Sequence, residues 1–541
     1  MNIGSPMLET GEAVALSRLH TGFLVSAARY PDRVALSIGQ QQWTYAQIEE
    51  LARRWAAQLV VVTDGQPARI GVLGYKSLTS YVGILASLFA GATYVPLNPN
   101  YPVLRTRAMA EQADLNAIIV DERSISQLPA IFDGRFTCPV VLSPTSAIDA
   151  VPSVASTVYG ERDIGSMKPL SEIPEVAASS TAYLLFTSGS TGKPNGVPVT
   201  HANVRYFLKV NSERYQINHE DTLTQIFDNT FDLSIFDIFM AWSHGAAVSS
   251  PEPLELLAPS RYVADRKISV WFSVPSLAAL LLNKRFLKPD SLPGLRWSLF
   301  CGEALPRKIA EAWQAAAPNS IVENLYGPTE LTICCAAYRW NAARSFNECV
   351  NGLVPIGQIY SGLDHVIVDD ELRLVAPGDV GELCVAGSQT FPGYWRDPAR
   401  TCARFFSHTD EGGRVCSYYR TGDLVKRLDG GHLAFMGRVD HQIKVRGYRI
   451  DPGDIEAILT RQLGVDQAVA LGWPVESESA QGIVAFVAGS LEDPTSLYDA
   501  LRQEVPAYMM PNKIYLVPSM PLNSNGKVDR SALRTRLELS V

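Results

Sequence analysis

The chain has 541 residues, of which 47% are hydrophobic and 19% charged. A single hydrophobic core stops growing at about 250–300 residues, so a chain of this length can bury more than one core and we expect at least two domains. Its 47 Lys and Arg against 55 Asp and Glu give a net charge of -8 without a basic block, which excludes the charge pattern of a nucleic-acid-binding protein. Eight cysteines without a CxxC pair have a spacing that indicates neither a disulfide framework nor a zinc site. The lack of a basic-then-apolar leader or of an apolar run of about 18–20 residues predicts a soluble, cytoplasmic protein without a membrane partner.

Short apolar runs that resemble buried strands alternate with helical patterns along most of the chain. This alternation is typical of α/β proteins, in which helices cover the sheets. The segment from Ser143 to Ser180 is rich in Ser, Pro and small residues, so we expect a surface connection without regular structure there. The expected strands are Ile70–Leu73, Tyr94–Pro96, Ala117–Val120, Ala182–Phe186 and Ile268–Phe272.

The last part of the chain has the pattern of a smaller domain. Arg427–Gly431, with the sequence RLDGG, indicates a hairpin turn between two strands. Beyond it, strands are expected at Ala468–Leu471 and Ile483–Val487 and a helix is expected to start at Pro452. These elements are sufficient for a small α+β lid.

A glycine-rich segment follows the strand expected at Ala182–Phe186 and precedes a helical stretch near His201. Glycines leave backbone N–H groups open, and hydroxyls and a lysine add donors, so the segment suits a polyphosphate. Its spacing matches neither a Walker A loop nor the Gly-x-Gly-x-x-Gly dinucleotide motif. On residue chemistry alone, phosphate binding and a flexible surface turn are equally open. The donors are Thr187, Ser188, Gly189, Ser190, Thr191, Gly192 and Lys193.

Further motifs follow in a fixed order. They are Ser87–Pro102, Asn324–Glu330 (NLYGPTE), Tyr419–Asp423 (YRTGD), Gly437–Lys444 (GRVDHQIK) and Pro521–Lys527 (PLNSNGK). With the glycine-rich loop they resemble the adenylate-forming superfamily, which holds acyl-CoA synthetases, firefly-type luciferases and the adenylation domains of nonribosomal peptide synthesis. For the first motif, helix–strand packing is a better interpretation than ligand contact. One departure is Asn195, where the family usually has Lys, and it removes a positive charge near the phosphates.

The resemblance implies a fold and two domains. It implies a large N-terminal domain of layered α/β sheets with a small barrel-like subdomain, residues 1–438, followed by a small α+β lid, residues 439–541. The hinge is expected near Asp440. In the family the lid turns about this hinge and brings Arg446–Ile450 toward a pantetheine tunnel for the second half-reaction.

The resemblance also implies ATP and Mg²⁺ as cofactors. Tyr326 would stack on adenine, Thr329 would hydrogen-bond the phosphate, and Glu330 would ligate Mg²⁺, a cation that prefers carboxylate oxygen. Asp423 would accept hydrogen bonds from the ribose, although a lone Asp after Gly is usually a turn residue. The implied nucleotide site also includes Gly302, Glu303, Asn324, Arg438 and the glycine-rich loop.

Lys527 is implied to be the catalytic lysine, acting with Thr329 and Glu330. Attack of a carboxylate on the α-phosphate of ATP brings anions together, so the site must supply positive charge. A general base is not required, because the nucleophile is already ionised.

The segment Phe231–Asp237 (FDLSIFD) matches the motif that opens the acid pocket of amino-acid-activating members. Asp232 would pair with the substrate α-ammonium, because a buried unpaired carboxylate is costly; a helix-capping role for Asp232 is the alternative. The neutral, mostly apolar walls indicate a small neutral L-amino acid, with proline ranked first and cysteine, serine or alanine behind it. The implied pocket consists of Asp232, Leu233, Phe236, Ser273, Leu299, Cys301, Leu325, Ile333 and Cys334.

The implied reaction forms an aminoacyl-AMP, releases pyrophosphate and passes the amino acid to a phosphopantetheine thiol. Only 14 residues follow Lys527, so we expect the carrier protein to act in trans. One alternative is an acyl-CoA ligase for acids without an amine, against which Asp232 argues. A second is a non-catalytic binding protein, against which Glu330, Asp423, Arg438 and Lys527 argue.

Overall fold

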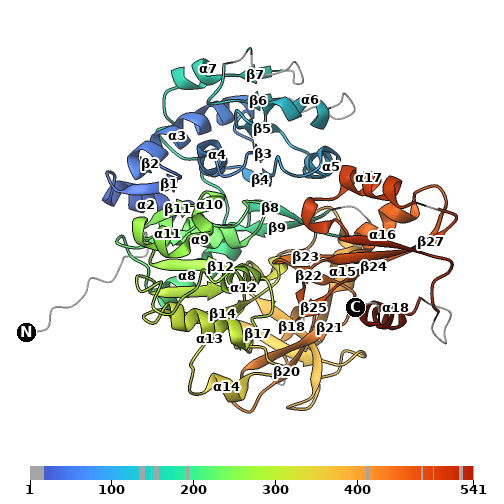
Figure 1. Ribbon diagram of the computed structural model, residues 1–541. Coiled ribbons are helices and arrows are strands. Elements are labelled where there is room, and N and C mark those ends of the chain that lie inside the picture. The colour runs from blue at the N-terminus through green and yellow to red at the C-terminus, as the bar shows by residue number, and fades with distance from the viewer. Residues whose placement is uncertain are drawn as a thin grey trace, which may run out of the picture.

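The computed structural model describes most of the chain. Two large sheets and an antiparallel subdomain form one body, and a small lid packs against it (Figure 1). This confirms the predicted fold class. No helix in the described ranges has the length and apolarity needed to cross a membrane. The described residues are 18–66, 68–132, 140–147, 149, 157–189, 194–409, 413–476, 479–491, 493–522 and 528–539.

The first large sheet has the strand order β7-β6-β5-β3-β4-β8-β9. It is parallel except for β9, which pairs antiparallel with β8. The glycine-rich loop therefore joins two antiparallel strands, and the predicted helix begins only after β9. The strands are β3 (Arg69–Leu73), β4 (Thr93–Leu97), β5 (Ala117–Val120), β6 (Val140–Leu142), β7 (Thr157–Tyr159), β8 (Thr181–Thr187) and β9 (Asn195–Thr200).

The second large sheet has the order β16-β15-β14-β13-β12-β10-β11-β1-β2. Its central strands are parallel, and β2, β15 and β16 add antiparallel edges. The carboxyl ends of its parallel strands lie at one edge, where ligands of open α/β sheets usually bind. The strands are β1 (Val34–Ile38), β2 (Gln41–Thr44), β10 (Thr222–Thr224), β11 (Ala247–Ser250), β12 (Val270–Ser273), β13 (Trp297–Phe300), β14 (Ile321–Tyr326), β15 (Ala336–Arg339) and β16 (Gln358–Ile359).

Helices between and around these sheets complete a large central hydrophobic core with smaller clusters beside it. The longer helices α3, α4 and α8 directly follow Thr44, Ser77 and Thr200, whose hydroxyls cap the first turn. Helices α4 and α9 are apolar and buried nearly all round, as expected for helices enclosed by other layers. The helices of this body are α2 (Thr21–Arg29), α3 (Tyr45–Val62), α4 (Leu78–Phe89), α5 (Val103–Ala113), α6 (Leu128–Ile131), α7 (Glu161–Ser166), α8 (His201–Tyr215), α9 (Leu233–Trp242), α10 (Pro253–Leu256), α11 (Pro259–Asp265), α12 (Pro275–Asn283), α13 (Arg307–Ala316), α14 (Ser345–Glu348) and α15 (Pro398–Arg404), with short 3-10 turns at Ile125–Gln127 and Thr329–Leu331.

An antiparallel sheet forms the expected small subdomain. Its long strand β20 pairs with β18 on one side and with β19 and β21 on the other. The predicted hairpin turn is confirmed, because Leu428 and His432 close it between β20 and β21. The strands are β17 (Leu363–Val368), β18 (Val380–Gly387), β19 (Phe405–Thr409), β20 (Val415–Arg427) and β21 (Leu433–Arg438).

The lid has its own hydrophobic core and two small sheets. The change of sheet between β21 and β22 falls at the proposed hinge, Asp440. The expected strands and the helix from Pro452 are all present. The lid elements are β22 (Ile443–Val445), β23 (Tyr448–Ile450), β24 (Val465–Gly472), β25 (Val475–Glu476), β26 (Ser479–Ala480), β27 (Ile483–Gly489), β28 (Lys513–Val517), α16 (Pro452–Thr460), α17 (Thr495–Glu504) and α18 (Arg530–Glu538), with a 3-10 turn at Ala507–Met509.

The expectation that Ser143–Ser180 lacks regular structure is wrong. The strand β7 extends the first sheet beside β6, and α7 follows it. The physical reason is local: Thr157 and Val158 favour a strand, and the Asp163 side chain accepts the Gly160 amide proton at 3.0 Å, which starts the helix. The Ser and Pro content of the segment concealed both elements.

Candidate active site

A cavity of about 90 Å³ lies where the two large sheets meet the lid. Residues from β8, the start of α9, the loop after β13, β20, β21 and the lid border it, so tertiary structure gathers segments that are far apart in the chain. Among its lining residues are the predicted Thr187, Ser188, Asp232, Leu233, Cys301, Gly302, Thr329, Asp423 and Arg438.

Asp232 is 7% exposed and borders this cavity. It occupies the residue before α9, but its side chain makes no capping hydrogen bond, so the capping alternative is contradicted. Burial raises the pKa of Asp232 to about 7; a hydrogen bond from Thr329 opposes this shift and the charge of Glu330 adds to it. A cation brought into the cavity would stabilise the ionised form.

Asp423, at the predicted ribose position, is held by two neighbours. The Tyr326 hydroxyl donates to one carboxylate oxygen at 2.6 Å, and Arg438 contacts the other. Arg438 also donates to both oxygens of Asp440, at 2.7 and 2.9 Å. The predicted adenine, ribose and hinge residues therefore form one hydrogen-bonded network. Gly302, Glu303 and Tyr326 also line one small adjoining cavity of about 20 Å³.

Glu330 lies in the turn after β14 and is 2% exposed. Burial alone would raise its pKa, but the Arg449 guanidinium, 3.2 Å away, and hydrogen bonds such as that from the Tyr394 hydroxyl, at 2.8 Å, lower it below the ordinary value. The carboxylate is therefore ionised, which is the form that coordinates a divalent cation.

The lid presents its Gly447 face to the cavity. The Gly447 amide donates to Glu303 at 2.7 Å, and Glu303 also accepts the Ser276 amide proton at 2.9 Å. Gly447 has φ +84, and a Cβ there would lie 2.3 Å from the Val274 side chain. Only glycine fits this contact.

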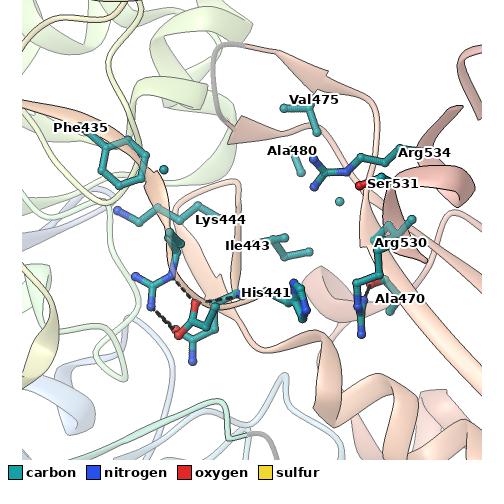
Figure 2. A pocket seen from close by; sticks show the side chains of 16 residues that line it. Phe435, His441, Ile443, Lys444, Ala470, Val475, Ala480, Arg530, Ser531 and Arg534 are labelled. Atoms are coloured by element: carbon teal, nitrogen blue, oxygen red, sulfur yellow. Dashed lines mark hydrogen bonds and ion pairs between the residues drawn. The ribbon is translucent and has the colours of Figure 1, made fainter. Parts of the chain in front are cut away.

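Lys527 lies outside the described residues, as do the loop residues Ser190, Thr191, Gly192 and Lys193. Helix α18, which follows it, borders a separate hollow of about 370 Å³. Figure 2 shows Phe435 and Lys444 on one side of this hollow and Arg530 and Arg534 on the other. The structure thus shows the lid with the Gly447 face turned inward, the arrangement expected for a second half-reaction.

Several predicted residues do not border the cavity with Asp232. Asn324 is buried and its amide donates to the Pro355 carbonyl at 2.9 Å. Leu325 borders the small adjoining cavity. The remaining pocket residues are buried in the core and do not line this cavity, and their roles stay predictions. They are Phe236, Ser273, Leu299, Ile333 and Cys334.

Sequence reasoning gave no individual role to five lid residues at the site, although Tyr448 and Arg449 lie in the expected tunnel segment Arg446–Ile450. Lys444 and Arg449 border the cavity, and Asp454 contacts the glycine-rich loop. Tyr448 stacks on Tyr508 with ring centroids 3.7 Å apart. Lys444 ends the Gly437–Lys444 motif, Arg449 and Tyr448 lie inside the segment Arg446–Ile450, and Asp454 follows that segment, so these motifs were the available signal. Tyr508 had no such signal, because only folding brings it against Tyr448.

A family model described as AMP-binding enzyme matches residues 23–395, and one described as AMP-binding enzyme C-terminal domain matches residues 454–527. The first match alone covers more than half of the chain. The chain belongs to the AMP-binding enzyme family. The resemblance seen in the motifs is therefore confirmed.

Individual members of the AMP-binding enzyme family support the same assignment. The chain is 33% identical, over 94% of its length, to a probable non-canonical nonribosomal peptide synthetase, CymA, of Salinispora arenicola, but spans only 6% of that protein. It is 27% identical to the Vibrio cholerae adenylation domain AlmE in complex with glycyl-adenosine-5'-phosphate, with a TM-score of 0.84 over 99% of this chain and 100% of that one. It is 25% identical to PA1221, an NRPS protein containing adenylation and PCP domains, with a TM-score of 0.78 over 96% of this chain and 84% of that one.

Asp232 predicts a pH dependence for this AMP-binding enzyme. Because its pKa is about 7 without a cation, lowering the pH protonates it and removes the negative charge that an α-ammonium needs. We expect kcat/KM for the amino acid to fall about tenfold per pH unit below this pKa. Pyrophosphate exchange from pH 5.5 to 8.5 measures the effect. A flat profile down to pH 5.5 would contradict it.

Proposed function

We propose that this enzyme activates a small neutral L-amino acid with ATP, forms an aminoacyl-AMP and transfers the amino acid to a carrier-bound thiol. The observation that carries the proposal is that Asp232 borders the same cavity as Asp423 and Arg438. The carboxylate that would pair with the substrate ammonium group therefore lines the same cavity as the residues predicted to bind the ribose. The solved neighbour with a bound glycyl adenylate supports the same chemistry.

In the first half-reaction, protein groups would orient the nucleotide and offset negative charge. Asp423 would accept the ribose hydroxyls, Tyr326 would contact adenine, and the Thr187 and Ser188 hydroxyls would contact phosphate. The buried, ionised Glu330, next to Thr329, fits a magnesium ligand. Bound Mg²⁺ would neutralise phosphate charge as pyrophosphate leaves.

In the second half-reaction the thiol would reach the adenylate along a groove. An open hollow of about 910 Å³ runs from the surface between α12 and the lid to Tyr448, which also borders the Asp232 cavity. A phosphopantetheine arm is long and narrow and suits such a passage. The neighbour that contains both adenylation and PCP domains supports a carrier partner, and we propose that the carrier is a separate protein.

The size and the neutral wall of the cavity limit which amino acid is the substrate. The cavity beside Asp232 is small, and its wall at Leu233 and Cys301 is neutral. A charged side chain would find no counter-ion among these residues. We rank proline first, followed by cysteine, serine and alanine. The differences in binding among these four are small, because one methylene in an apolar pocket changes binding by only about 1–3 kcal/mol.

A panel of the twenty amino acids in ATP–pyrophosphate exchange tests the proposal. We expect exchange above background with small neutral L-amino acids and none with the matching acids that lack the amine. Exchange with fatty or aryl acids only would show an acyl-CoA ligase. A lack of exchange with every acid would favour the binding-protein alternative.

Thioester transfer is tested with two acceptors. Radiolabelled amino acid, ATP and Mg²⁺ are supplied with either a purified phosphopantetheinylated carrier protein or CoA. We expect stoichiometric loading of the carrier and little of CoA. Loading of CoA alone would contradict the carrier assignment.

A further inference from the structure

A hollow of about 370 Å³ lies between the large body and helix α18 of the lid, and we call it the α18 hollow. Phe435 of the large body lines it on one side, and Arg530 and Arg534 of α18 line it on the other. Figure 2 shows this arrangement, with Lys444 on the side of Phe435. The proposed reaction assigns this hollow no role.

The α18 hollow adjoins the groups proposed to hold the nucleotide. Arg438 and Lys444 line both the hollow and the cavity that contains Asp423. Phe435 and Lys444 line both the hollow and the small cavity of about 20 Å³ beside Tyr326. A nucleotide with its ribose on Asp423 and its base on Tyr326 would therefore be separated from the hollow by the Arg438 and Lys444 side chains.

Lys444 is the movable part of this wall. Arg438 is held by Asp440, to which it donates at 2.7 and 2.9 Å, and by Asp423. The Lys444 ammonium makes no hydrogen bond or ion pair within the described part of the chain, and it lies 6.0 Å from the Tyr326 ring centroid, at the outer limit of a cation–π contact. Burial lowers the pKa of Lys444, because its present position is unfavourable for the charge. The side chain can therefore swing toward the open hollow at little cost.

The α18 hollow has a positive lining. Arg530 is fixed at its wall, because it donates to Glu456 at 2.7 Å and to a carbonyl of β24 at 2.9 Å. Arg534 is exposed and makes no hydrogen bond or ion pair to another described residue. Asp440 is the one carboxylate among the described residues that line the hollow, and Arg438 already pairs with it. An anion in the hollow would therefore meet an unpaired guanidinium.

Other sides of the cavity are occupied in this orientation of the lid. The open groove of about 910 Å³ would hold the phosphopantetheine arm. On the loop side the Ser188 hydroxyl donates to the Arg449 carbonyl at 2.7 Å, so the lid packs directly on the start of the glycine-rich loop. In the described part of the chain, the α18 hollow is the opening that remains next to the proposed ribose and adenine groups.

We propose that AMP leaves the active site through the α18 hollow while the lid keeps its Gly447 face inward. After the thioester has formed, Lys444 swings aside and Arg534 attracts the departing phosphate. A phosphate monoester suits a route lined by guanidinium groups. Release of AMP then does not have to wait for the lid to turn back. Arg534 is a positioning residue on this route, and the inference rests on the proposed function.

The kinetics of AMP binding to the full chain test the route, and they require neither an amino acid nor a carrier. Arg534→Glu reverses the charge at the hollow, and Ser531→Trp fills it, since Ser531 also lines the hollow from α18. A route changes how fast a ligand enters and leaves but not how tightly it is held. We therefore expect AMP association and dissociation each to slow about tenfold in both variants, with an unchanged Kd. Surface plasmon resonance measures all three quantities.

Arg536→Glu and Thr535→Trp are the matched controls. Both residues are exposed on α18 and do not line the hollow, so these variants make the same changes of charge and size elsewhere on the helix. We expect wild-type AMP kinetics in both. Wild-type rates in Arg534→Glu and Ser531→Trp would overturn the proposal, as would equal slowing in the controls. A weaker Kd with unchanged association would place Arg534 in the nucleotide site itself and would also overturn it.

A single-turnover experiment separates this inference from the proposed function. Enzyme that carries preformed, radiolabelled aminoacyl-AMP is mixed with excess pantetheine; thioester is quenched with acid, and free AMP is separated from bound AMP by rapid filtration. In Arg534→Glu we expect thioester to form at the wild-type rate and AMP to leave about tenfold more slowly. Wild-type release of AMP by this variant would overturn the inference and leave the proposed function intact. Failure of the wild type to form an adenylate with any acid would overturn the proposed function instead, and the AMP binding kinetics would still test the route.

Discussion

Lys527→Ala is expected to lower ATP–pyrophosphate exchange at least about a hundredfold. The lysine charge would offset the repulsion between the negatively charged substrate carboxylate and the α-phosphate that it attacks. Thioester formation from preformed aminoacyl-AMP should stay near the wild-type rate. In the lid orientation that the structure shows, the Gly447 face borders the cavity, so the second step does not need Lys527. Exchange and single-turnover thioester assays on the same preparation measure both rates.

Lys513→Ala serves as the control for this variant. Lys513 is an exposed lid lysine whose ammonium lies 4.5 Å from the Tyr515 ring centroid. It removes a lid charge without touching the proposed machinery, so both half-reactions should be unchanged. Wild-type exchange by Lys527→Ala would refute the catalytic assignment, and equal loss of both half-reactions would indicate a folding role.

Asp232→Asn is expected to lower kcat/KM for the amino acid at least about a hundredfold, because it leaves the buried α-ammonium without a counter-charge, at a cost of about 3–5 kcal/mol. The loss should appear mainly in KM. Exchange with the corresponding acid that lacks the amine should stay at background, so the margin between the amino acid and this acid narrows. ATP–pyrophosphate exchange with paired acids measures this ratio.

Asp237→Asn is the matched control on the same helix. Asp237 is buried away from the cavity, and burial raises its pKa well above the ordinary value, with Lys76 opposing the shift. Burial therefore favours the neutral form of this carboxyl group, which Asn resembles closely. We expect near wild-type kinetics. An equal loss of kcat/KM in both variants would show that Asp232 acts through the fold of α9 and not through its charge.

Much of the secondary structure was predictable because it depends on local pattern. Apolar runs gave β3, β5 and β8 to within a residue or two, and the Asp-Gly-Gly turn placed the hairpin between β20 and β21. Segments without such a pattern were missed: β7 and α7 are short, and their Ser- and Pro-rich surroundings predict a loop.

The candidate site was predictable for residues in contiguous motifs. Asp232, Thr329, Asp423 and Arg438 border one cavity, although their motifs are far apart in the chain. The deeper pocket residues, such as Phe236 and Cys334, were placed by register alone. The structure buries them in the core without exposing them to the cavity. Register could not reveal this, because it does not specify how far a cavity extends.

By itself, the sequence determined the order of elements, the motifs and the chemical types at the site, because these depend on neighbouring residues. Only the tertiary structure decided which face of the lid meets the cavity, and with it the pairing of Arg449 with Glu330 and of Asp454 with Gly189. Those contacts join residues 119 and 265 positions apart. They form only when the lid packs against the large body, and local sequence does not encode that placement.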